Sequence, residues 1–493
     1  MLTPGLVKAP AGPVADDRRV PAPTHHRPIG SLLFAGNRRL PVSTESFPTH
    51  TPAPAHDPGQ TPAGPRTGVW LIGARGSVAT TAVAGCAATV AGLHPPTGLV
   101  TETRPFAGAG LAPLSSLVFG GHDTADCPLP KRAEALAEGG VLPHGLPTAV
   151  RAELEAADRA IRPGGPQSGD PRSTEELVDA FAADLTAFRE EHGLARVVVI
   201  NVASTEPAPA DGTLPASSLY AAAALRAGCP YANFTPSTGI HHPDLAEQAR
   251  ASGLPYAGRD GKTGQTLLRS VLGPMFRDRA LAVRAWSGSN LLGGGDGAAL
   301  ADPAAAAAKN AGKERVLADT LPTVPEGEVH IDDVPALGDW KTAWDHIAFD
   351  GFLGTRMVLQ TIWQGCDSAL AAPLVLDLAR LLTRAHEAGI SGPLGELAFY
   401  FKDPDALRAP DGESPPPWPA SPSSTSSFWA SPAAWEPPRD PPPHPGRTPR
   451  RLGRTPAGLG GVQRPRRRPR RSRRLRDTPR PPHPARRRLL ALP

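Results

Sequence analysis

The stretch GVWLIGARGSVATTAVAGCAATV, residues 68–90, decides the fold. Residues 69–72 are consecutive apolar side chains that run into a glycine turn at residues 73–77, which predicts a buried strand. The uncharged run after the turn is small and broken by glycine, so it predicts a buried helix rather than a membrane span. A strand, a glycine turn and a helix in this order are typical of a dinucleotide-binding unit, with a plain strand-to-helix turn as an equal alternative.

Working outward, the same pattern repeats. Residues 197–202 in ARVVVINVAST form a second continuous apolar strand, of the kind found in sheets covered on both faces. Residues 133–138 and 174–191 are expected to be helices, the second opened by a Ser173 cap. Alternating strands and helices predict an α/β fold, a Rossmann-like doubly wound parallel sheet.

The character changes after residue 266. The segments 270–290, 326–333 and 355–365 predict strands and loops of an inserted α+β unit. Residues 370–389 then predict a strong amphipathic helix that ends at Gly389.

Proline marks the ends of the folded part. Residues 1–66 hold 13 prolines and residues 409–493 hold 22, and neither flank has hydrophobic periodicity. We expect both flanks to be disordered, because they offer too little apolar surface to offset the entropy of ordering. The expected organisation is 1–66 disordered, 67–266 NAD-binding, 267–365 an inserted catalytic and oligomerisation unit, 366–408 a return to the first unit, and 409–493 a disordered tail.

Charge is distributed unevenly. Residues 439–493 carry 18 arginines and two acids, a net of +16, so the rest of the chain carries −11 within the total of +5. The basic pI therefore belongs to the tail, and it is weak evidence for nucleic-acid binding by the folded part. Four dispersed cysteines and the absence of an apolar leader at the N-terminus predict reduced thiols in a soluble, cytoplasmic protein.

The lysines are the strongest chemical signal. Only seven occur against 45 arginines, and five of them follow residue 260: Lys262, Lys309, Lys313, Lys341 and Lys402. Lysine differs from arginine because its pKa falls when it is buried, so it can pass protons. Lys309 and Lys313 stand four residues apart, a like-charge spacing that an anion between them would stabilise. An aromatic run before Lys402 would desolvate its amine. The alternative for each lysine is an ordinary solvated side chain.

Several polar loops accompany the lysines. NVASTE (201–206) follows the second strand, where the side chains of a parallel sheet line the ligand crevice. NFTPS (233–237), GRDGKTGQT (258–266) and SNLLGGGDG (289–297) hold hydroxyl and amide groups or glycines suited to a phosphate or a sugar. Ordinary turn chemistry is the competing interpretation for each loop.

Taken in order, GARGS, GGHD, NVASTE, NFTPS, GRDGKTGQT, SNLLGGGDG, KNAGK, GDWK, CDSALAAP and FYFKDP resemble the myo-inositol-phosphate synthases, in particular their bacterial branch. The likeness runs from about residue 68 to residue 404. It departs from the family in a shorter glycine loop carrying Arg75, and in the Pro/Arg-rich sequence where the family continues with a structured segment.

The resemblance implies isomerisation of D-glucose 6-phosphate to 1L-myo-inositol 1-phosphate, also named 1D-myo-inositol 3-phosphate, for inositol and phospholipid biosynthesis. The family uses NAD to oxidise carbon 5, enolises at carbon 6, closes the ring by an intramolecular aldol reaction and reduces the product. Lysines suit this chemistry, because an enolate and an alkoxide need a nearby positive charge. A homotetramer is implied, while a metal requirement is left open.

The resemblance also implies roles for particular residues. The catalytic set is Lys309, Lys313, Lys341, Lys402 and Asp260. The substrate-binding set is Asn290, Asp296, Lys262 and Thr263. The cofactor-binding set is Gly73, Gly76, Ser77, Asp123, Thr205, Thr235, Ser237, Asp339 and Asp367.

Two other functions remain open from the sequence. One is a different NAD(P)-dependent dehydrogenase with an inserted α+β unit, which would produce NADH in proportion to substrate. The other is an inactive relative whose arginine run at 464–488 binds nucleic acid with a steep salt dependence. The tail lacks interleaved aromatics for base stacking, which disfavours that second function.

Overall fold

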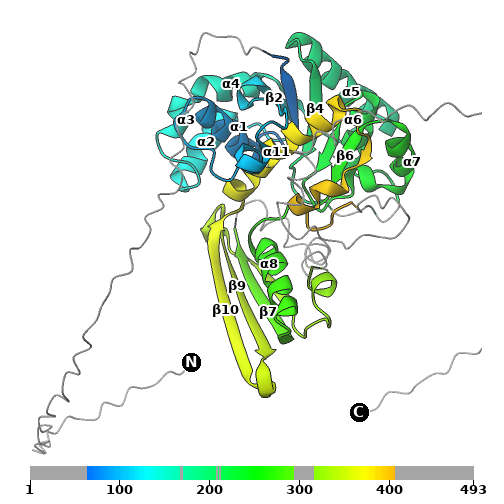
Figure 1. Cartoon of the computed structure of the whole chain (residues 1–493). Helices are drawn as coiled ribbons and strands as arrows, with labels where there is room; N and C mark the ends of the chain where they lie inside the picture. The colour runs from blue at the N-terminus through cyan, green and yellow to red at the C-terminus, as the bar shows by residue number, and fades with distance from the viewer. Residues whose placement is uncertain (1–63, 167–169, 207–208, 210–211, 294–315, 406–493) are drawn as a thin grey trace, which may run out of the picture. The chain divides into compact units, whose positions relative to one another are not determined.

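The computed structural model describes residues 64–166, 170–206, 209, 212–293 and 316–405, so the flanks expected to be disordered lie outside it apart from residues 64–66. The described chain is built on two β-sheets, one of seven strands and one of four (Figure 1). Within these residues, no helix is both long and apolar enough to cross a membrane.

The seven-stranded sheet is parallel throughout and has the order β11-β6-β5-β4-β1-β2-β3. Its strands are β1 (Thr67–Ile72), β2 (Leu117–Asp123), β3 (Ile161–Pro163), β4 (Arg196–Asn201), β5 (Tyr231–Asn233), β6 (Pro255–Gly258) and β11 (Gly392–Pro393). The chain runs outward from β1 to β3 and then returns to β4 on the other side of β1. Ligands of such sheets bind where the strand order reverses, at the carboxyl ends of β1 and β4. The predicted Rossmann-like α/β fold is confirmed.

Both faces of this sheet are covered by helices, which explains the unbroken apolar strands. Val69 and Leu71 face a core that includes α1 (Ser77–Val90) and α11 (Asp367–Glu387). Trp70 and Ile72 face the opposite core, with α5 (Thr174–Glu191) and α6 (Ala216–Arg226). A strand with a core on each side has no solvent face on which to place polar residues.

The predicted local signals are present in these helices. Ser173 caps α5, and Glu176 reaches back to it in a capping box. Gly389 follows α11 with φ of 70°, the left-handed conformation expected where a helix ends. The other described helices of this part are α2 (Leu129–Glu138), α3 (Leu146–Ala149), α4 (Arg151–Arg159), α7 (Pro243–Ala251), η1 (Val100–Glu102), η2 (Arg104–Phe106), η3 (Leu114–Ser116), η4 (Gly239–His241) and η7 (Gly395–Tyr400).

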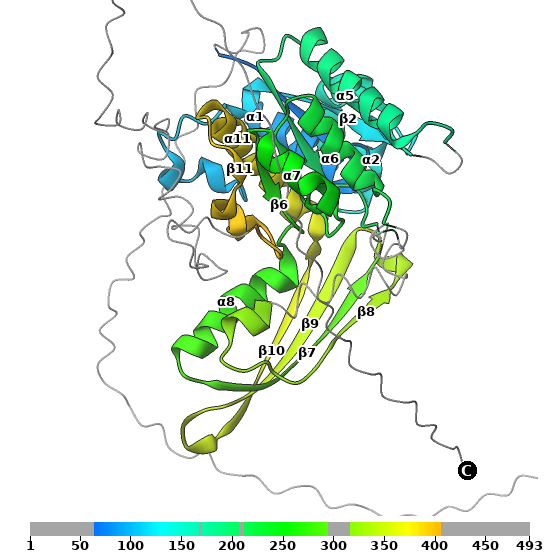
Figure 2. The same cartoon turned by 90° about the vertical axis from the view of Figure 1, so that its right-hand side faces the viewer.

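The four-stranded sheet has the order β10-β9-β7-β8, with β7 antiparallel to β9 and β9 antiparallel to β10. Its strands are β7 (Ala282–Leu292), β8 (Val329–Asp333), β9 (Trp340–Asp350) and β10 (Arg356–Cys366), and its short 3-10 turns are η5 (Pro335–Leu337) and η6 (Phe352–Gly354). Helix α8 (Gly264–Asp278) packs along one face, where Phe276, Trp286 and Ile347 form a separate core (Figure 2).

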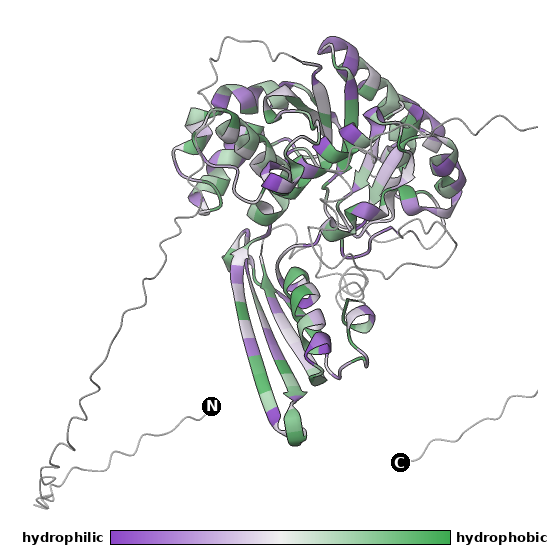
Figure 3. Cartoon of the chain, in the orientation of Figure 1, coloured by the Kyte–Doolittle hydropathy of each residue, from purple (hydrophilic) through white to green (hydrophobic). Residues whose placement is uncertain are grey.

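The other face of this sheet lacks a covering helix in the described chain. Ile362 and Val358 on β10 are 69% and 54% exposed, and Trp344 on the neighbouring strand is 37% exposed. Figure 3 shows hydrophobic residues along β10 on this open sheet. This face therefore leaves apolar side chains in contact with solvent in the described chain.

The expectation of strands and loops for residues 270–290 was wrong in its first part. Residues 270–278 belong to α8, and the strand begins only at Ala282. The helix is stable because Arg269, Gly273 and Phe276 recur at helical spacing on its buried side. Pro274 lies inside α8 and hid this period, since proline is usually a helix breaker.

Candidate active site

The glycine turn after β1 forms a tight backbone cradle. Gly73 has φ of 83°, and a Cβ at this position would lie 2.7 Å from the Cα of Ala203. Its amide and that of Ala74 donate to the carbonyl of His122 at 2.9 and 3.2 Å, which ties the turn to β2. Gly76 precedes the first turn of α1. A glycine turn pressed against the next strand, with a helix N-terminus behind it, fits the pyrophosphate of a dinucleotide.

Asp123 at the end of β2 lies beside this turn. Its carboxylate accepts hydrogen bonds from the amides of Arg75 at 2.6 Å and Ala125 at 2.7 Å. The guanidinium of Arg75 pairs with Asp158 at 3.1 Å. Asp123 therefore stabilises the turn at the strand end where the predicted cofactor-binding acid belongs.

The predicted hydroxyl residues lie at the carboxyl ends of β4 and β5. Buried Thr235 and Ser237 belong to a polar network with two buried asparagines, in which the amide of Asn201 donates to Asn233 and to Thr235, each at 3.2 Å. Thr205 is half-buried in the loop that follows β4. These strand ends meet at the crevice of the sheet. The two asparagines open the motifs NVASTE and NFTPS, which were recognised in the sequence, but no role was predicted for their side chains.

The loop before β9 reaches the same glycine turn. Ser77, the first residue of α1, donates to the carboxylate of Asp339 at 2.8 Å, and Arg132 donates to the Ser77 hydroxyl at 2.6 Å. The indole of Trp340 donates to the carbonyl of Gly139 at 2.8 Å. Two residues assigned to the cofactor by resemblance, Ser77 and Asp339, thus touch one another although they are far apart in the sequence.

Lys341 and Lys402 each pair with a carboxylate. Lys402 lies 2.8 Å from Asp260, and both side chains are more than nine-tenths buried. Lys341 bonds Asp367, the first residue of α11, whose other oxygen accepts from Thr263 at 3.0 Å. Burying a charged amine is costly unless a carboxylate accompanies it, so the pairing explains how the fold tolerates them.

These groups line one hollow, formed by Thr263, Gln265, Thr266, Asn290, Leu292, Lys341, Asp367 and Lys402. The residues come from the start of α8, from β7 and β9, from the start of α11 and from the segment after η7. The wall holds two ammonium groups, one carboxylate, two amides and two hydroxyls, a set that suits a phosphorylated polyol.

Lys262 lies beside the segment that carries Lys402. Burial lowers the pKa of its amine from 10.5 to about 7, and the amine lies 5.8 Å from the centre of the Phe399 ring. The amide of Lys262 donates to the carbonyl of Tyr400, and the amide of Lys402 donates to the carbonyl of Asp260. An amine with a pKa near neutrality can both accept and release a proton at physiological pH.

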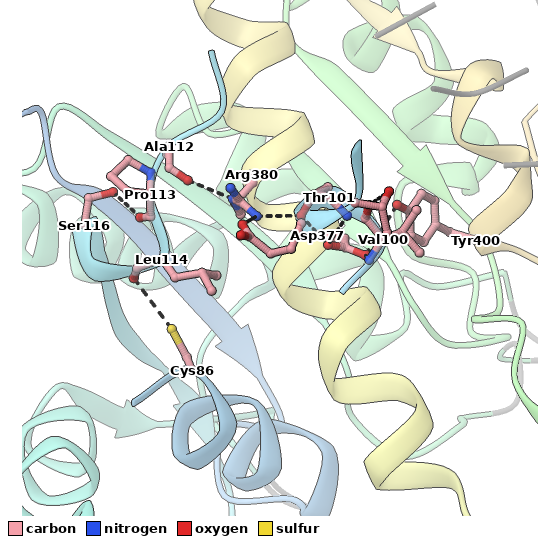
Figure 4. Close-up of polar contacts among 12 residues, drawn as sticks. Cys86, Val100, Thr101, Ala112, Pro113, Leu114, Ser116, Asp377, Arg380 and Tyr400 are labelled. Carbon is pink, nitrogen blue, oxygen red and sulfur yellow. Dashed lines mark hydrogen bonds and ion pairs between the residues drawn. The ribbon is translucent and has the colours of Figure 1, made fainter. Parts of the chain in front are cut away.

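A buried carboxylate, Asp377, lies on α11 (Figure 4). Asp377 accepts hydrogen bonds from the amides of Val100 at 2.8 Å and Thr101 at 3.1 Å, and the Tyr400 hydroxyl approaches it at 3.5 Å. Burial raises the pKa of Asp377 to about 7. This cluster joins the helix that carries Asp367 to the residue two positions before Lys402.

Lys309, Lys313 and Asp296 lie outside the described residues. Among the residues that are described, no three His, Cys, Asp or Glu side chains gather in a way that could hold a metal ion.

Gln265, Arg132 and Asn201 are site or turn residues to which the sequence analysis gave no individual role. The sequence analysis recognised the loop motif that contains Gln265, but it could not predict where the Gln265 side chain lies.

Comparison with known proteins gives the family. Residues 67–211 and 264–368 each match a family model described as myo-inositol-1-phosphate synthase. An inositol-3-phosphate synthase of Bacteroides thetaiotaomicron is 32% identical over 393 residues, which cover 70% of this chain and 90% of that protein. An inositol-3-phosphate synthase of Trypanosoma brucei brucei is 32% identical over 51% of this chain and 53% of its own length.

Comparison with solved structures agrees with the sequence matches. The crystal structure of inositol-3-phosphate synthase from Caenorhabditis elegans superposes with a TM-score of 0.64 at 24% identity, covering 76% of this chain and 87% of that one, which supports the fold. The glycine cradle at Gly73 fits the NAD used by the family. The matches favour the synthase over a different dehydrogenase or a nucleic-acid-binding relative. This chain belongs to the myo-inositol-1-phosphate synthase family.

Proposed function

We propose that this chain converts D-glucose 6-phosphate to 1L-myo-inositol 1-phosphate in the hollow beside the glycine turn. The observation that supports this proposal most strongly is the convergence of two lysine–carboxylate pairs, Lys341–Asp367 and Lys402–Asp260, near one cofactor cradle. A reaction that passes through an enolate and an alkoxide needs positive charge at both stages. A simple dehydrogenase needs it at one.

NAD, when bound, supplies an acceptor and donor of hydride. We assign its pyrophosphate to the cradle of Gly73, Gly76 and Ser77, its adenosine side to Asp123 and Thr205, and its nicotinamide side to Thr235, Ser237, Asp339 and Asp367. The crevice between β1 and β4 favours this direction, because the glycine turn and Asp123 lie toward β2, while the hydroxyl network lies toward β5.

The chain's own residues then handle charge and protons. Lys402 and Lys341 stabilise negative charge on the sugar oxygens or hold the phosphate, and their carboxylate partners hold the amines in place. Lys262, with its lowered pKa, accepts a proton from a hydroxyl or an acidic carbon and returns it later. Thr263 and Asn290 position the sugar through hydrogen bonds. The resemblance assigns Lys309, Lys313 and Asp296 to the same site.

We further propose that the protein is a homo-oligomer, a tetramer by resemblance, assembled through the open face of the four-stranded sheet. The exposed Ile362, Val358 and Trp344 support this, since a second copy would remove their apolar surface from water. All four cysteines are free, which fits the cytoplasmic location we propose. We also retain the division into an NAD-binding unit at 67–266 with 366–408 and an inserted unit at 267–365.

The deciding experiment is an assay of the purified full chain. Glucose 6-phosphate and a catalytic amount of NAD should yield an inositol phosphate, detected by phosphorus and proton NMR, with no lasting absorbance at 340 nm. NADH that accumulates in proportion to the sugar consumed would instead identify a dehydrogenase. Full activity after both Lys341→Ala and Lys402→Ala would remove the lysines from the mechanism.

A further inference from the structure

A buried polar chain runs from the core of the four-stranded sheet to the wall of the hollow. Asp345 on β9 accepts three hydrogen bonds, from Arg269 at 3.1 Å, from the Trp286 indole at 2.8 Å and from the Gln265 amide at 2.9 Å. Gln265 in turn accepts a hydrogen bond from the amide nitrogen of Asn290 at 2.7 Å. All five side chains are about 2% exposed or less.

The two oxygens of Asp345 have separate partners. Oδ1 receives Arg269 and Trp286, whereas Oδ2 receives Nε2 of Gln265. Gly288 on β7 leaves room for the hydrogen bond between Gln265 and Asp345, because a Cβ at this position would lie 2.7 Å from the Gln265 amide nitrogen. The fold has therefore kept a side chain out of the path of the network.

An ionised carboxylate accepts hydrogen bonds and cannot donate them, whereas a side-chain amide can present either end. Asp345 therefore forces the nitrogen of Gln265 toward itself and the oxygen of Gln265 toward Asn290. That oxygen in turn binds the nitrogen of Asn290. Asn290 donates one N–H to Gln265, so its oxygen, an acceptor, and its second N–H are left to meet a ligand.

We propose that Asp345 is a positioning residue that sets the direction of this amide chain, so that Asn290 offers an acceptor to a hydrogen-bond donor of the bound ligand. This inference rests on the proposed function, because the hollow is assigned to a sugar phosphate and NAD. The donor is a hydroxyl of the sugar or the N–H of the nicotinamide carboxamide, which share this chemistry. Asp345 itself lies behind the wall and does not touch the ligand.

The test exchanges one oxygen and one nitrogen across the Asp345–Gln265 contact. Asp345→Asn alone places two amide nitrogens against each other, so Gln265 and then Asn290 must turn round and present a donor. Asp345→Asn combined with Gln265→Glu restores the original direction: the new amide donates to the new carboxylate, which still accepts from Asn290. Net charge and side-chain size are unchanged in the double variant.

The measurements are the glucose 6-phosphate KM at saturating NAD, the Kd of each ligand by calorimetry, and the thermal midpoint, all on the full chain. We expect Asp345→Asn to weaken one ligand about 10-fold or more, since a donor then faces a donor. The double variant should bind that ligand at least about threefold more tightly than Asp345→Asn, with the remaining loss due to the carboxylate that it places at position 265 in the wall of the hollow. A sugar donor shifts glucose 6-phosphate binding, and a carboxamide donor shifts NAD binding.

Asp350→Asn is the matched control, because it removes a carboxylate from the same strand. Asp350 pairs with exposed Arg284 at 2.9 Å at the far end of β9, away from the hollow. It should leave both affinities unchanged. A purely structural role for Asp345 would lower the thermal midpoint and kcat together without selective loss of one ligand.

Three results would overturn the proposal: unchanged affinity for both ligands in Asp345→Asn, a double variant that folds but binds as poorly as the single one, or a double variant that does not fold. If the single variant is too unstable to assay, recovery of folding and binding in the double variant still supports the proposal. Calorimetry does not require turnover. A wild-type chain that binds both ligands but makes no inositol phosphate therefore refutes the proposed function and leaves this test valid.

Discussion

The two sheets of this protein differ in how far their strands are buried. Strand β4 of the seven-stranded sheet has five of its six residues buried, whereas nearly every residue of β10 in the four-stranded sheet is at least partly exposed. The first sheet is closed by helices on both faces, and the second by α8 on one face. The comparison shows that the described chain encloses the seven-stranded sheet on both faces but leaves one face of the four-stranded sheet exposed.

The proposed cofactor-binding and substrate-binding parts of the site also differ in what forms them. The cofactor side depends on backbone shape, because Gly73 can approach Ala203 only without a side chain. The substrate side depends on side-chain charge, with Lys341 of one sheet paired with Asp367 of the helix that returns to the other. Changes that add a Cβ should therefore damage cofactor binding, and changes that remove a charge should damage catalysis.

The largest expected effect comes from Lys402→Met. Loss of this buried ammonium should lower kcat/KM for glucose 6-phosphate by about 100- to 1,000-fold, because the oxyanion it stabilises loses its partner. The Kd of NAD should change less than about threefold, since the cofactor cradle is separate. Lys131→Met, at an exposed lysine of α2, is the control in the same steady-state assay. A kcat/KM above a tenth of the original would show that Lys402 is not needed for chemistry.

Gly73→Ala should instead weaken the binding of NAD. The new methyl group would meet the Ala203 backbone at a φ of 83°, so the turn must move, at a cost of about 1–3 kcal/mol. We expect NAD affinity, followed by protein fluorescence, to fall about 10-fold or more. Gly145→Ala is the control, because Gly145 has φ of −78° and open space around it. Unchanged NAD binding in Gly73→Ala would place the cofactor elsewhere.

Ile362→Asp tests the surface that distinguishes the second sheet. A carboxylate on this apolar face should dissociate the proposed oligomer, because it would be buried without a partner. Light scattering after size exclusion measures the mass directly. Val271→Asp changes a side chain of similar exposure, 60%, on α8 and should leave the mass unchanged. An oligomer that persists in Ile362→Asp would assign assembly to another surface.

The smallest effect is the pH dependence of stability due to Lys262. Its folded pKa of about 7 lies below the ordinary value of 10.5, so between these values the unfolded chain holds a proton that the folded chain does not. The free energy of unfolding should therefore rise with pH in this window by up to about 1.4 kcal/mol per pH unit. Below pH 7 the amine is protonated in both states, so Lys262 should add no pH dependence there.

Lys262→Met removes that group, so the difference in unfolding free energy between it and the unchanged protein should depend on pH only above about 7. Urea unfolding at pH 6, 7, 8 and 9 measures the difference. Lys131→Met, at an exposed lysine of α2, is the control. A parallel pair of curves for wild type and Lys262→Met would mean that the Lys262 amine is hydrated in the folded state.

Local signals were enough to predict much of the first sheet. Four apolar residues before Gly73, and Ser173 with Glu176 three residues later, define a strand and a helix without any tertiary information. Helix α8 was missed because Pro274 interrupts its period, and only packing against the second sheet stabilises it.

The site was predicted through the family resemblance rather than through spacing. Lys341, Asp367 and Lys402 were named, but nothing in the local sequence pairs Lys341 with Asp367 or Lys402 with Asp260. Asp345 was missed for a similar reason, since its partners Gln265 and Arg269 lie on a helix some 76 to 80 positions away. Such contacts exist only after the chain has folded.

The most direct test of the account follows an isotope through the reaction. Glucose 6-phosphate carrying deuterium at carbon 5 is incubated with the full chain and unlabelled NAD, and the product is analysed by mass spectrometry and NMR. A hydride that is removed and returned within one closed site predicts inositol phosphate with the deuterium retained on the same carbon and no accumulated NADH. Deuterated NADH released in step with sugar consumption, or no cyclised product at all, would contradict the account.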